Sequence, residues 1–165
     1  MLYLKLIILQ VFWYFAIKSG ANVFFPALAL LLLITDFFLF FKQPNRQKYL
    51  IFSGVLILIG FFLDQSFHSL GAIEWGSQRY PFELLAVWII FPCYYHDVFT
   101  KFMDRPSIAF IIGFIFGPFA YFSGGNINQM ISINTTILNL LTLGIGWGSF
   151  FFTSVYFFKK YVLRG

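Results

Sequence analysis

Residues 49–70 read YLIFSGVLILIGFFLDQSFHSL, and this stretch decides the fold. As a helix it is long enough to cross the roughly 30 Å hydrocarbon core of a bilayer. Asp64 stands inside the apolar run, and His68 follows one helical turn later. An ionisable side chain in a membrane segment is costly unless it has a partner or a function. The stretch therefore predicts a membrane helix with one carboxylate, which needs either a bonding partner or a functional role.

The composition of the 165-residue chain is that of an integral membrane protein. Hydrophobic residues make up 60% of it and charged residues only 10%, whereas a soluble domain has about 25% charged residues. The net charge of +5 does not indicate nucleic-acid binding, because the basic residues lie in short loops and not along one face of a soluble element. We therefore expect membrane lipids as partners and no nucleic acid.

Six apolar segments are long enough to cross the membrane. The predicted crossings are residues 2–19, 24–41, 49–70, 81–100, 106–123 and 135–158. Their apolar runs are continuous, and open strands cannot satisfy their backbone groups in lipid, so the crossings are predicted to be helices. The predicted fold is all-α: a polytopic membrane protein with one transmembrane domain over residues 1–165, a bundle of six helices.

The positive charges predict how the chain is threaded. With the N-terminus in the cytoplasm, every Lys and Arg except Lys18 and Arg79 falls on the cytoplasmic side. Such a bias is the usual orientation signal of membrane proteins. We expect a multi-pass protein of the bacterial inner (cytoplasmic) membrane with both termini in the cytoplasm.

Polar residues are expected to gather on the outer side. Asp64 lies about 22 Å into its crossing at 1.5 Å per residue, and His68 at i+4 can pair with it. Glu83 begins the fourth crossing, Lys18 ends the first, and Arg79 lies in the loop between the third and the fourth. Two interpretations are open. In the first, Asp64 pairs with Lys18 or His68 and holds helices together. In the second, the cluster has a function: it binds a polar ligand or a lipid head group, or it transfers protons.

A second cluster is predicted on the cytoplasmic side. Its members are Asp36, His96, Asp97 and Lys101. The spacing of four residues, with the acid first, favours an ion pair between Asp97 and Lys101. The long Lys101 side chain can also extend its charge to the membrane interface. In the middle of the first crossing, Gln10 either bonds to a neighbouring helix or lines a site.

Glycine pairs predict close packing of helices. Gly113 with Gly117, and Gly144 with Gly148, have the spacing of small residues that lets two helices approach each other. The contact lies within the chain, with another membrane protein, or between copies in a homo-oligomer. The uncharged polar segment 123–136 is either a flexible outer loop or a loop that dips back to cap a cavity.

No motif indicates catalysis. Asp64 and His68 offer one acid–base pair, but no nucleophile, metal set or phosphate loop accompanies them. Cys93 is the single cysteine, so an intramolecular disulfide and a cysteine-based metal site are excluded. We expect no metal and no cofactor, and an isolated enzyme is the least favoured class.

Several short stretches together resemble a known family. They are LQVFW at residues 9–13 followed by SGA at 19–21, Asp64 with LG at 70–71, VWIIF at 87–91 and GPFAYFSG at 117–124. The family consists of uncharacterised bacterial inner-membrane proteins, small and multi-pass, and is defined only as a domain of unknown function. Its genes often lie near genes for enzymes similar to cyclopropane-fatty-acyl-phospholipid synthase. The resemblance implies an accessory role in acyl-chain modification of phospholipids or in membrane stress responses.

Different functions remain open at this point. The first is a lipid-associated protein that holds a lipid between helices, with head-group contacts from the cluster around Asp64, His68, Glu83 and Arg79. The second is a small-solute binding subunit of a transporter, because six helices in 165 residues resemble the substrate-binding subunits of energy-coupling vitamin transporters. The third is a structural subunit of a membrane complex.

The threading is tested with reporter fusions. A green fluorescent protein fused after Gly165 is expected to fluoresce, and an alkaline phosphatase at the same point is expected to be inactive, because both termini are predicted to be cytoplasmic. The same two reporters fused after Arg79 serve as the outer control, with the opposite result. Phosphatase activity after Gly165 would contradict this topology.

Overall fold

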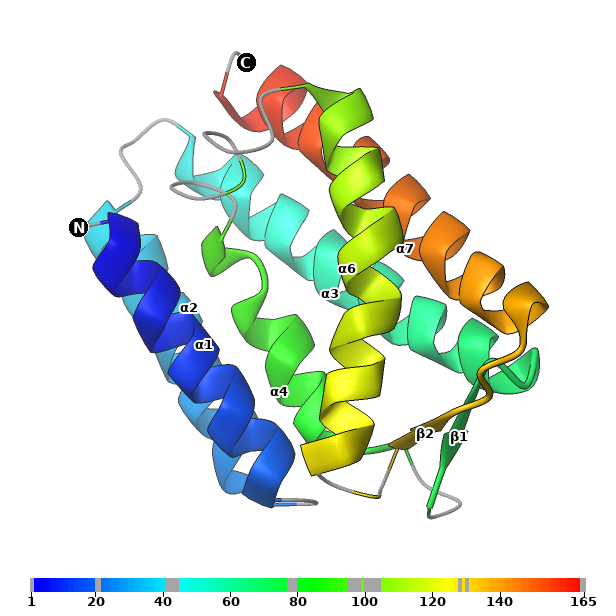
Figure 1. Ribbon diagram of the computed structural model, residues 1–165. Helices are drawn as coiled ribbons and strands as arrows, with labels where there is room; N and C mark the ends of the chain where they lie inside the picture. The colour runs from blue at the N-terminus through cyan, green and yellow to red at the C-terminus, as the bar shows by residue number, and fades with distance from the viewer. Residues whose placement is uncertain are drawn as a thin grey trace.

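The computed structural model describes residues 2–19, 22–40, 45–76, 80–94, 99, 105–127, 129 and 131–163, with the backbone alone for 2–6 and 39–40. The helices are α1 (Leu2–Ser19), α2 (Phe24–Phe40), α3 (Arg46–Ser69), α4 (Phe82–Ile90), α6 (Pro106–Ile127) and α7 (Ile137–Phe157), followed by the π-helical turn η2 (Phe158–Leu163). Two short strands are present, β1 (Ile73–Trp75) and β2 (Ile131–Ile133). The all-α fold class is confirmed (Figure 1).

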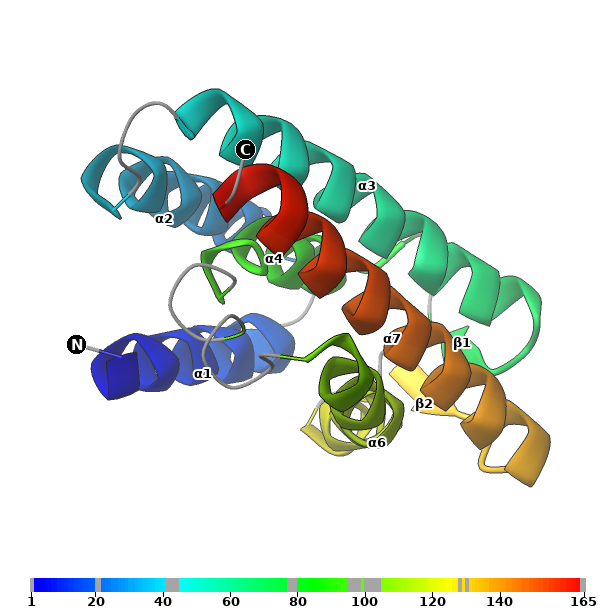
Figure 2. The same ribbon diagram turned by 90° about the horizontal axis from the view of Figure 1, so that it is seen from above.

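The short helix α4 occupies the centre of the bundle. It packs against α1, α2 and α3, and Figure 2 shows α1 and α2 on opposite sides of it. Its side chains Leu84, Ala86, Trp88 and Ile90 are buried. The core is therefore built around a helix of nine residues.

The helices α6 and α7 form an antiparallel pair with the most extensive contact in the molecule (Figure 1). The glycines predicted for helix packing all face this contact: Gly113 and Gly117 on α6, Gly144 and Gly148 on α7. An added Cβ at Gly113 would lie 2.6 Å from the carbonyl oxygen of Trp147, and one at Gly148 would lie 2.9 Å from the Phe110 ring. Each glycine lets the two backbones approach within one chain.

The fourth predicted crossing differs from the observed helix. A continuous helix was expected over residues 81–100, but α4 ends at Ile90. Pro92 has no N–H, and its ring clashes with the carbonyl four residues earlier, so it ends the helical hydrogen bonding. Phe91 and Pro92 then form a buried turn, and the Tyr94 N–H donates to the Phe91 carbonyl at 3.1 Å. Burial makes this turn tolerable, because irregular backbone at membrane depth must be covered by protein.

The described residues of the polar segment 123–136 include helix and strand. The helix α6 continues through it to Ile127, and β2 pairs antiparallel with β1, with Ile73 opposite Ile133 and Trp75 opposite Ile131. Ile73 and Ile131 are buried. The two-stranded sheet therefore closes one end of the bundle (Figure 1).

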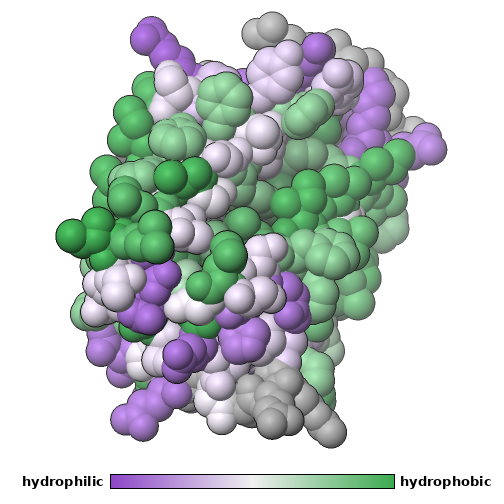
Figure 3. Space-filling view, turned by 90° about the vertical axis from the view of Figure 1, so that its right-hand side faces the viewer, coloured by the Kyte–Doolittle hydropathy of each residue, from purple (hydrophilic) through white to green (hydrophobic). Residues whose placement is uncertain are grey.

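The surface and the helix lengths are those of a membrane protein. In the described part of the chain, three helices are long and apolar enough to cross a membrane: Arg46–Ser69, Pro106–Ile127 and Ile137–Leu163. Shorter apolar helices are Ile7–Ser19 and Phe24–Phe38. Figure 3 shows an apolar band across one face, with hydrophilic residues toward the two ends. Large exposed side chains such as Phe62 contribute to the apolar surface, as expected for a surface that contacts lipid.

The glycine contact between α6 and α7 predicts a stability difference between two matched variants. Gly113→Ala is expected to lower the melting temperature, whereas Gly54→Ala is not. Both changes gain roughly 1 kcal/mol of helix propensity. Only at Gly113 would the new Cβ meet backbone, because nothing lies within 4 Å of Gly54. Overpacking of this kind costs about 1–3 kcal/mol.

Thermal unfolding followed by circular dichroism in one detergent measures both variants. A Gly113→Ala protein that melts at or above the temperature of Gly54→Ala would show that the glycine is not needed for this contact.

Candidate functional site

Asp64 is fully buried in α3, and other segments of the chain converge on it. Its Oδ2 accepts hydrogen bonds from the Tyr80 hydroxyl at 2.7 Å and from the Trp88 Nε1 at 2.6 Å. Its Oδ1 accepts a hydrogen bond from the Tyr121 hydroxyl. A buried carboxylate requires such donors, because leaving its oxygens unpaired is costly. One carboxylate therefore connects α3 to α4, to the segment that precedes α4, and to α6.

Gly60 makes the contact between Trp88 and Asp64 possible. It lies one helical turn before Asp64 on α3, and an added Cβ there would lie 2.1 Å from the Trp88 ring. Without that Cβ the indole lies against α3 and reaches the carboxylate. The Trp88 ring also stacks on Trp147 of α7, with ring centroids 5.1 Å apart and an interplanar angle of 11°. The indole therefore contacts both α3 and α7.

Tyr80, in the segment between β1 and α4, remains a hydrogen-bond donor. Burial, and after it the Asp64 carboxylate, raise the pKa of the Tyr80 hydroxyl well above its ordinary value, so the group stays protonated. The charge of Glu83 acts on the pKa of Tyr80 in the same direction. Both acidic side chains therefore lie within electrostatic reach of this one hydroxyl.

His68 does not pair with Asp64, as the i+4 spacing had suggested. Its Nδ1 lies 3.2 Å from the carbonyl oxygen of Ile73. Its ring stacks on Trp75 of β1, with centroids 4.0 Å apart and an interplanar angle of 9°. The acceptor positions of Asp64 are taken by aromatic donors from other segments, and His68 instead joins the end of α3 to the sheet.

Glu83 is the second buried carboxylate at this end of the molecule. It is 1% exposed, and neither of its oxygens has a hydrogen-bond partner within the described ranges. Lys18, expected nearby, is exposed, with its Nζ 5.7 Å from the centroid of the Tyr14 ring. Arg79 lies outside the described residues. Among the described members of the predicted outer cluster, Asp64 and Glu83 are buried, whereas Lys18 is exposed and His68 contacts the sheet.

A cavity of about 460 Å³ lies beside Asp64, between α1, α4, α6 and α7. The wall from α1 consists of Gln10, Trp13 and Ile17, whose spacing places them on one helix face. Aromatic rings form much of the opposite wall: Trp88, Phe91, Trp147 and Phe151. The volume falls within the roughly 300–1,000 Å³ of small-molecule sites. The cavity is therefore large enough for a ligand.

Two sequence alternatives concern the lining of this cavity. Gln10 lines it and is exposed, with no hydrogen bond to any other described side chain or backbone group. Ile131 of β2 also lines it, so the strand that follows α6 contributes to the cavity wall. The position of Gln10 is that of a lining residue.

The predicted cytoplasmic cluster is described only at Asp36. This residue is buried and accepts a hydrogen bond from the Tyr49 hydroxyl at 2.8 Å, which connects α2 to α3. His96, Asp97 and Lys101 lie outside the described residues. Within the described ranges, no three His, Cys, Asp or Glu side chains are close enough together to hold a metal ion.

The donors around Asp64 are the site residues that sequence reasoning missed. Trp88 and Tyr121 stand in two of the stretches that carry the family resemblance, VWIIF and GPFAYFSG. The sequence offered one indication of their role: a buried tyrosine hydroxyl or tryptophan N–H usually has a hydrogen-bond partner. Sequence alone gives no distance between these tips and the carboxylate.

The fold and the cavity define a helical membrane protein with a cavity of ligand size between its helices. The chain belongs to the family described as "Protein of unknown function (DUF2878)", whose model matches residues 2–153. This match confirms the resemblance to a domain-of-unknown-function family. No curated protein and no solved structure matches the chain.

The hydrogen bonds to Asp64 predict an ordered series of stability losses. Asparagine offers one acceptor oxygen and an NH₂ group, so Asp64→Asn leaves at least one buried donor unpaired, at about 1–3 kcal/mol. Tyr80→Phe removes one donor and leaves the carboxylate with two, so a smaller loss is expected. The double variant is expected to lose less than the sum, because both changes affect one interaction.

The melting temperatures of the three variants in one detergent measure this series. Glu74→Gln, which neutralises an exposed carboxylate in β1, is the control and is expected to melt like the wild type. A wild-type melting temperature for Asp64→Asn would mean that this network does not hold the helices.

Proposed function

We propose that this protein binds a membrane lipid and holds one of its apolar chains in the cavity beside Asp64. The observation that carries the proposal is the cavity itself, about 460 Å³ with mainly apolar and aromatic walls, in a protein whose helices are apolar enough for membrane spans. Small-molecule sites orient polar ligands with several placed polar groups. The apolar lining therefore favours a lipid chain over the polar solute of a transporter subunit.

The distribution of polarity along the cavity supports an amphiphilic ligand. The carboxylate of Asp64 lies at the end where α4 begins, and Glu83 is in the first turn of that helix. Beyond the end of α4 the lining is aromatic. Phe99 lies 5.5 Å from Phe91 and 5.1 Å from Phe151 between ring centroids. A lipid would place its head near the carboxylates and its chain among these rings.

The placement in the membrane belongs to the same proposal. We infer six crossings of a bacterial inner membrane with both termini in the cytoplasm, in which α4 and the buried turn after it form part of the fourth. The sheet and the two acidic side chains then lie toward the outer face. The gene neighbourhood implied by the family resemblance suggests an accessory role in acyl-chain modification of phospholipids or in membrane stress.

Filling the cavity tests lipid binding. Wild-type protein purified in mild detergent is expected to carry a lipid-sized mass adduct in native mass spectrometry. Ala120→Trp, on the cavity wall, is expected to lose the adduct because the indole occupies the space of the chain. Ala27→Trp adds the same side chain at an exposed position of α2 and is expected to keep the adduct.

The outcome is interpreted only for variants with the circular dichroism spectrum of the wild type. A wild type without lipid, or an Ala120→Trp protein with the full adduct, would contradict the proposal. The same variants test the accessory role: in a deletion strain, Ala27→Trp but not Ala120→Trp is expected to restore the acyl-chain profile, and a deletion strain with a normal profile would rule that role out.

A further inference from the structure

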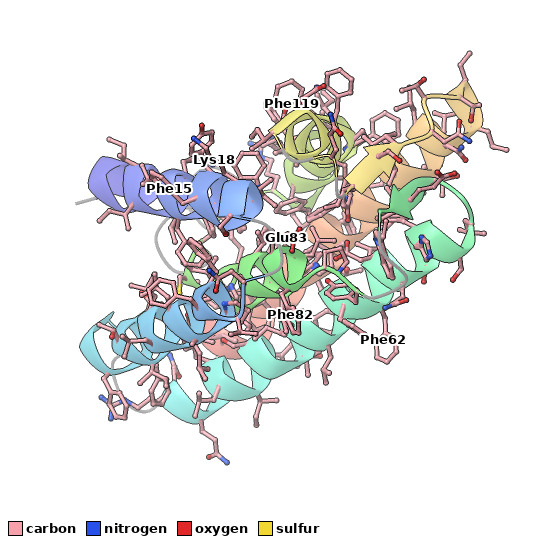
Figure 4. All side chains as sticks on the ribbon, turned by 90° about the horizontal axis from the view of Figure 1, so that it is seen from below. Phe15, Lys18, Phe62, Phe82, Glu83 and Phe119 are labelled. Atoms are coloured by element: carbon pink, nitrogen blue, oxygen red, sulfur yellow. The ribbon has the colours of Figure 1, made fainter. Side chains whose placement is uncertain are left out.

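Glu83 extends the cavity-lining face of α4 by one turn. Val87 and Ile90 line the cavity, and they lie four and seven residues after Glu83, on the same face of the helix. Figure 4 shows the Glu83 side chain on the side of α4 that faces α1 and α6. Phe82 lies on the opposite side of α4 and is exposed. The Glu83 carboxylate therefore lies on the cavity side of α4, one turn beyond the residues of this helix face that line the cavity.

The Glu83 carboxylate lacks a partner that its burial requires. It is 1% exposed, and neither oxygen is hydrogen-bonded to any residue that the structure describes. A buried carboxylate is stabilised only when it is paired and hydrogen-bonded. A ligand that enters the cavity can supply the missing donors.

The charge of Asp64 is hydrogen-bonded but not neutralised by its described partners. Two hydroxyls and an indole donate to it, and all three groups are neutral. Glu83 adds a second acidic group near the same tyrosine, Tyr80. Lys18, a described cation of the adjoining helix end, is exposed and directed at the Tyr14 ring. In apolar surroundings such charges interact strongly, so this end of the cavity favours a positive group.

We propose that the ligand is an amphiphile with an ammonium head, which the Glu83 carboxylate binds beside Asp64 while the apolar chain extends toward Phe91 and Phe151. An ammonium group carries three donors and no acceptor, which fits unpaired carboxylate oxygens. A phosphate or carboxylate head without an amine is disfavoured by repulsion. This inference rests on the proposed lipid binding and adds the sign and the chemistry of the head group.

Chain-matched probes test the inference on the full-length, lipid-depleted protein in an uncharged detergent at neutral pH. The probes are dodecylamine, dodecanol and dodecanoate, and binding is followed by tryptophan fluorescence because Trp13, Trp88 and Trp147 line the cavity. Dodecylamine is expected to bind at least about tenfold more tightly than dodecanol, and dodecanoate is expected to bind least.

Variants locate the preference. Glu83→Gln is expected to remove most of the preference for dodecylamine over dodecanol. Glu74→Gln, at an exposed carboxylate in the nearby strand β1, is expected to keep the preference. A second set, short-chain phosphatidylethanolamine against phosphatidylglycerol, identifies the source of the amine. Preference for the ethanolamine lipid indicates a phospholipid head, whereas tight binding of dodecylamine alone indicates a single-chain amine.

The outcomes separate this inference from lipid binding itself. Equal affinities for the three probes, or tightest binding of dodecanoate, would overturn the ammonium head and leave lipid binding intact. Binding of none of the probes would overturn both. The comparison of probes on the wild type decides the sign of the head even where Glu83→Gln does not fold.

Discussion

The hydrogen bonds to the buried Asp64 carboxylate are the constraint on which the arrangement of α3, α4 and α6 depends. Tyr80, Trp88 and Tyr121 donate to the same two oxygens. Moving any one of these segments would leave a buried donor or a buried charge without a partner, and either is costly inside an apolar protein. The central helix is therefore positioned by polar contacts as well as by apolar packing.

The cavity follows from an uneven distribution of packing around this network. On one side, glycines let α6 and α7 approach closely, and Gly60 lets the Trp88 indole lie against α3. On the other side, α1 lies mainly on α4 and has little contact with α6, so an open space remains between them. The nine residues of α4 end at a buried turn that contains Pro92, and aromatic residues line the cavity there. Broken helices of this kind often line binding sites in membrane proteins.

Sequence patterns predicted those parts of the fold that depend on neighbouring residues. They predicted the site only in part. The first helix has the predicted bounds, and α2 begins at the predicted residue. The end of α4 was missed although Pro92 is a visible signal, and the strands were missed because three residues are too few for an alternating pattern. Asp64 stood out as an acid in an apolar run. Its partners did not, because they lie 16, 24 and 57 residues away, and the nearby His68 finds another acceptor.

A crystal structure of the protein grown in a lipid mesophase tests the central claim most directly. It is predicted to show elongated density along the cavity from Glu83 to Phe151, with the Trp88 indole and the hydroxyls of Tyr80 and Tyr121 on the Asp64 carboxylate. A cavity closed by α1 packed onto α6, or a lipid-free cavity with Asp64 paired to Lys18 or His68, would contradict the account.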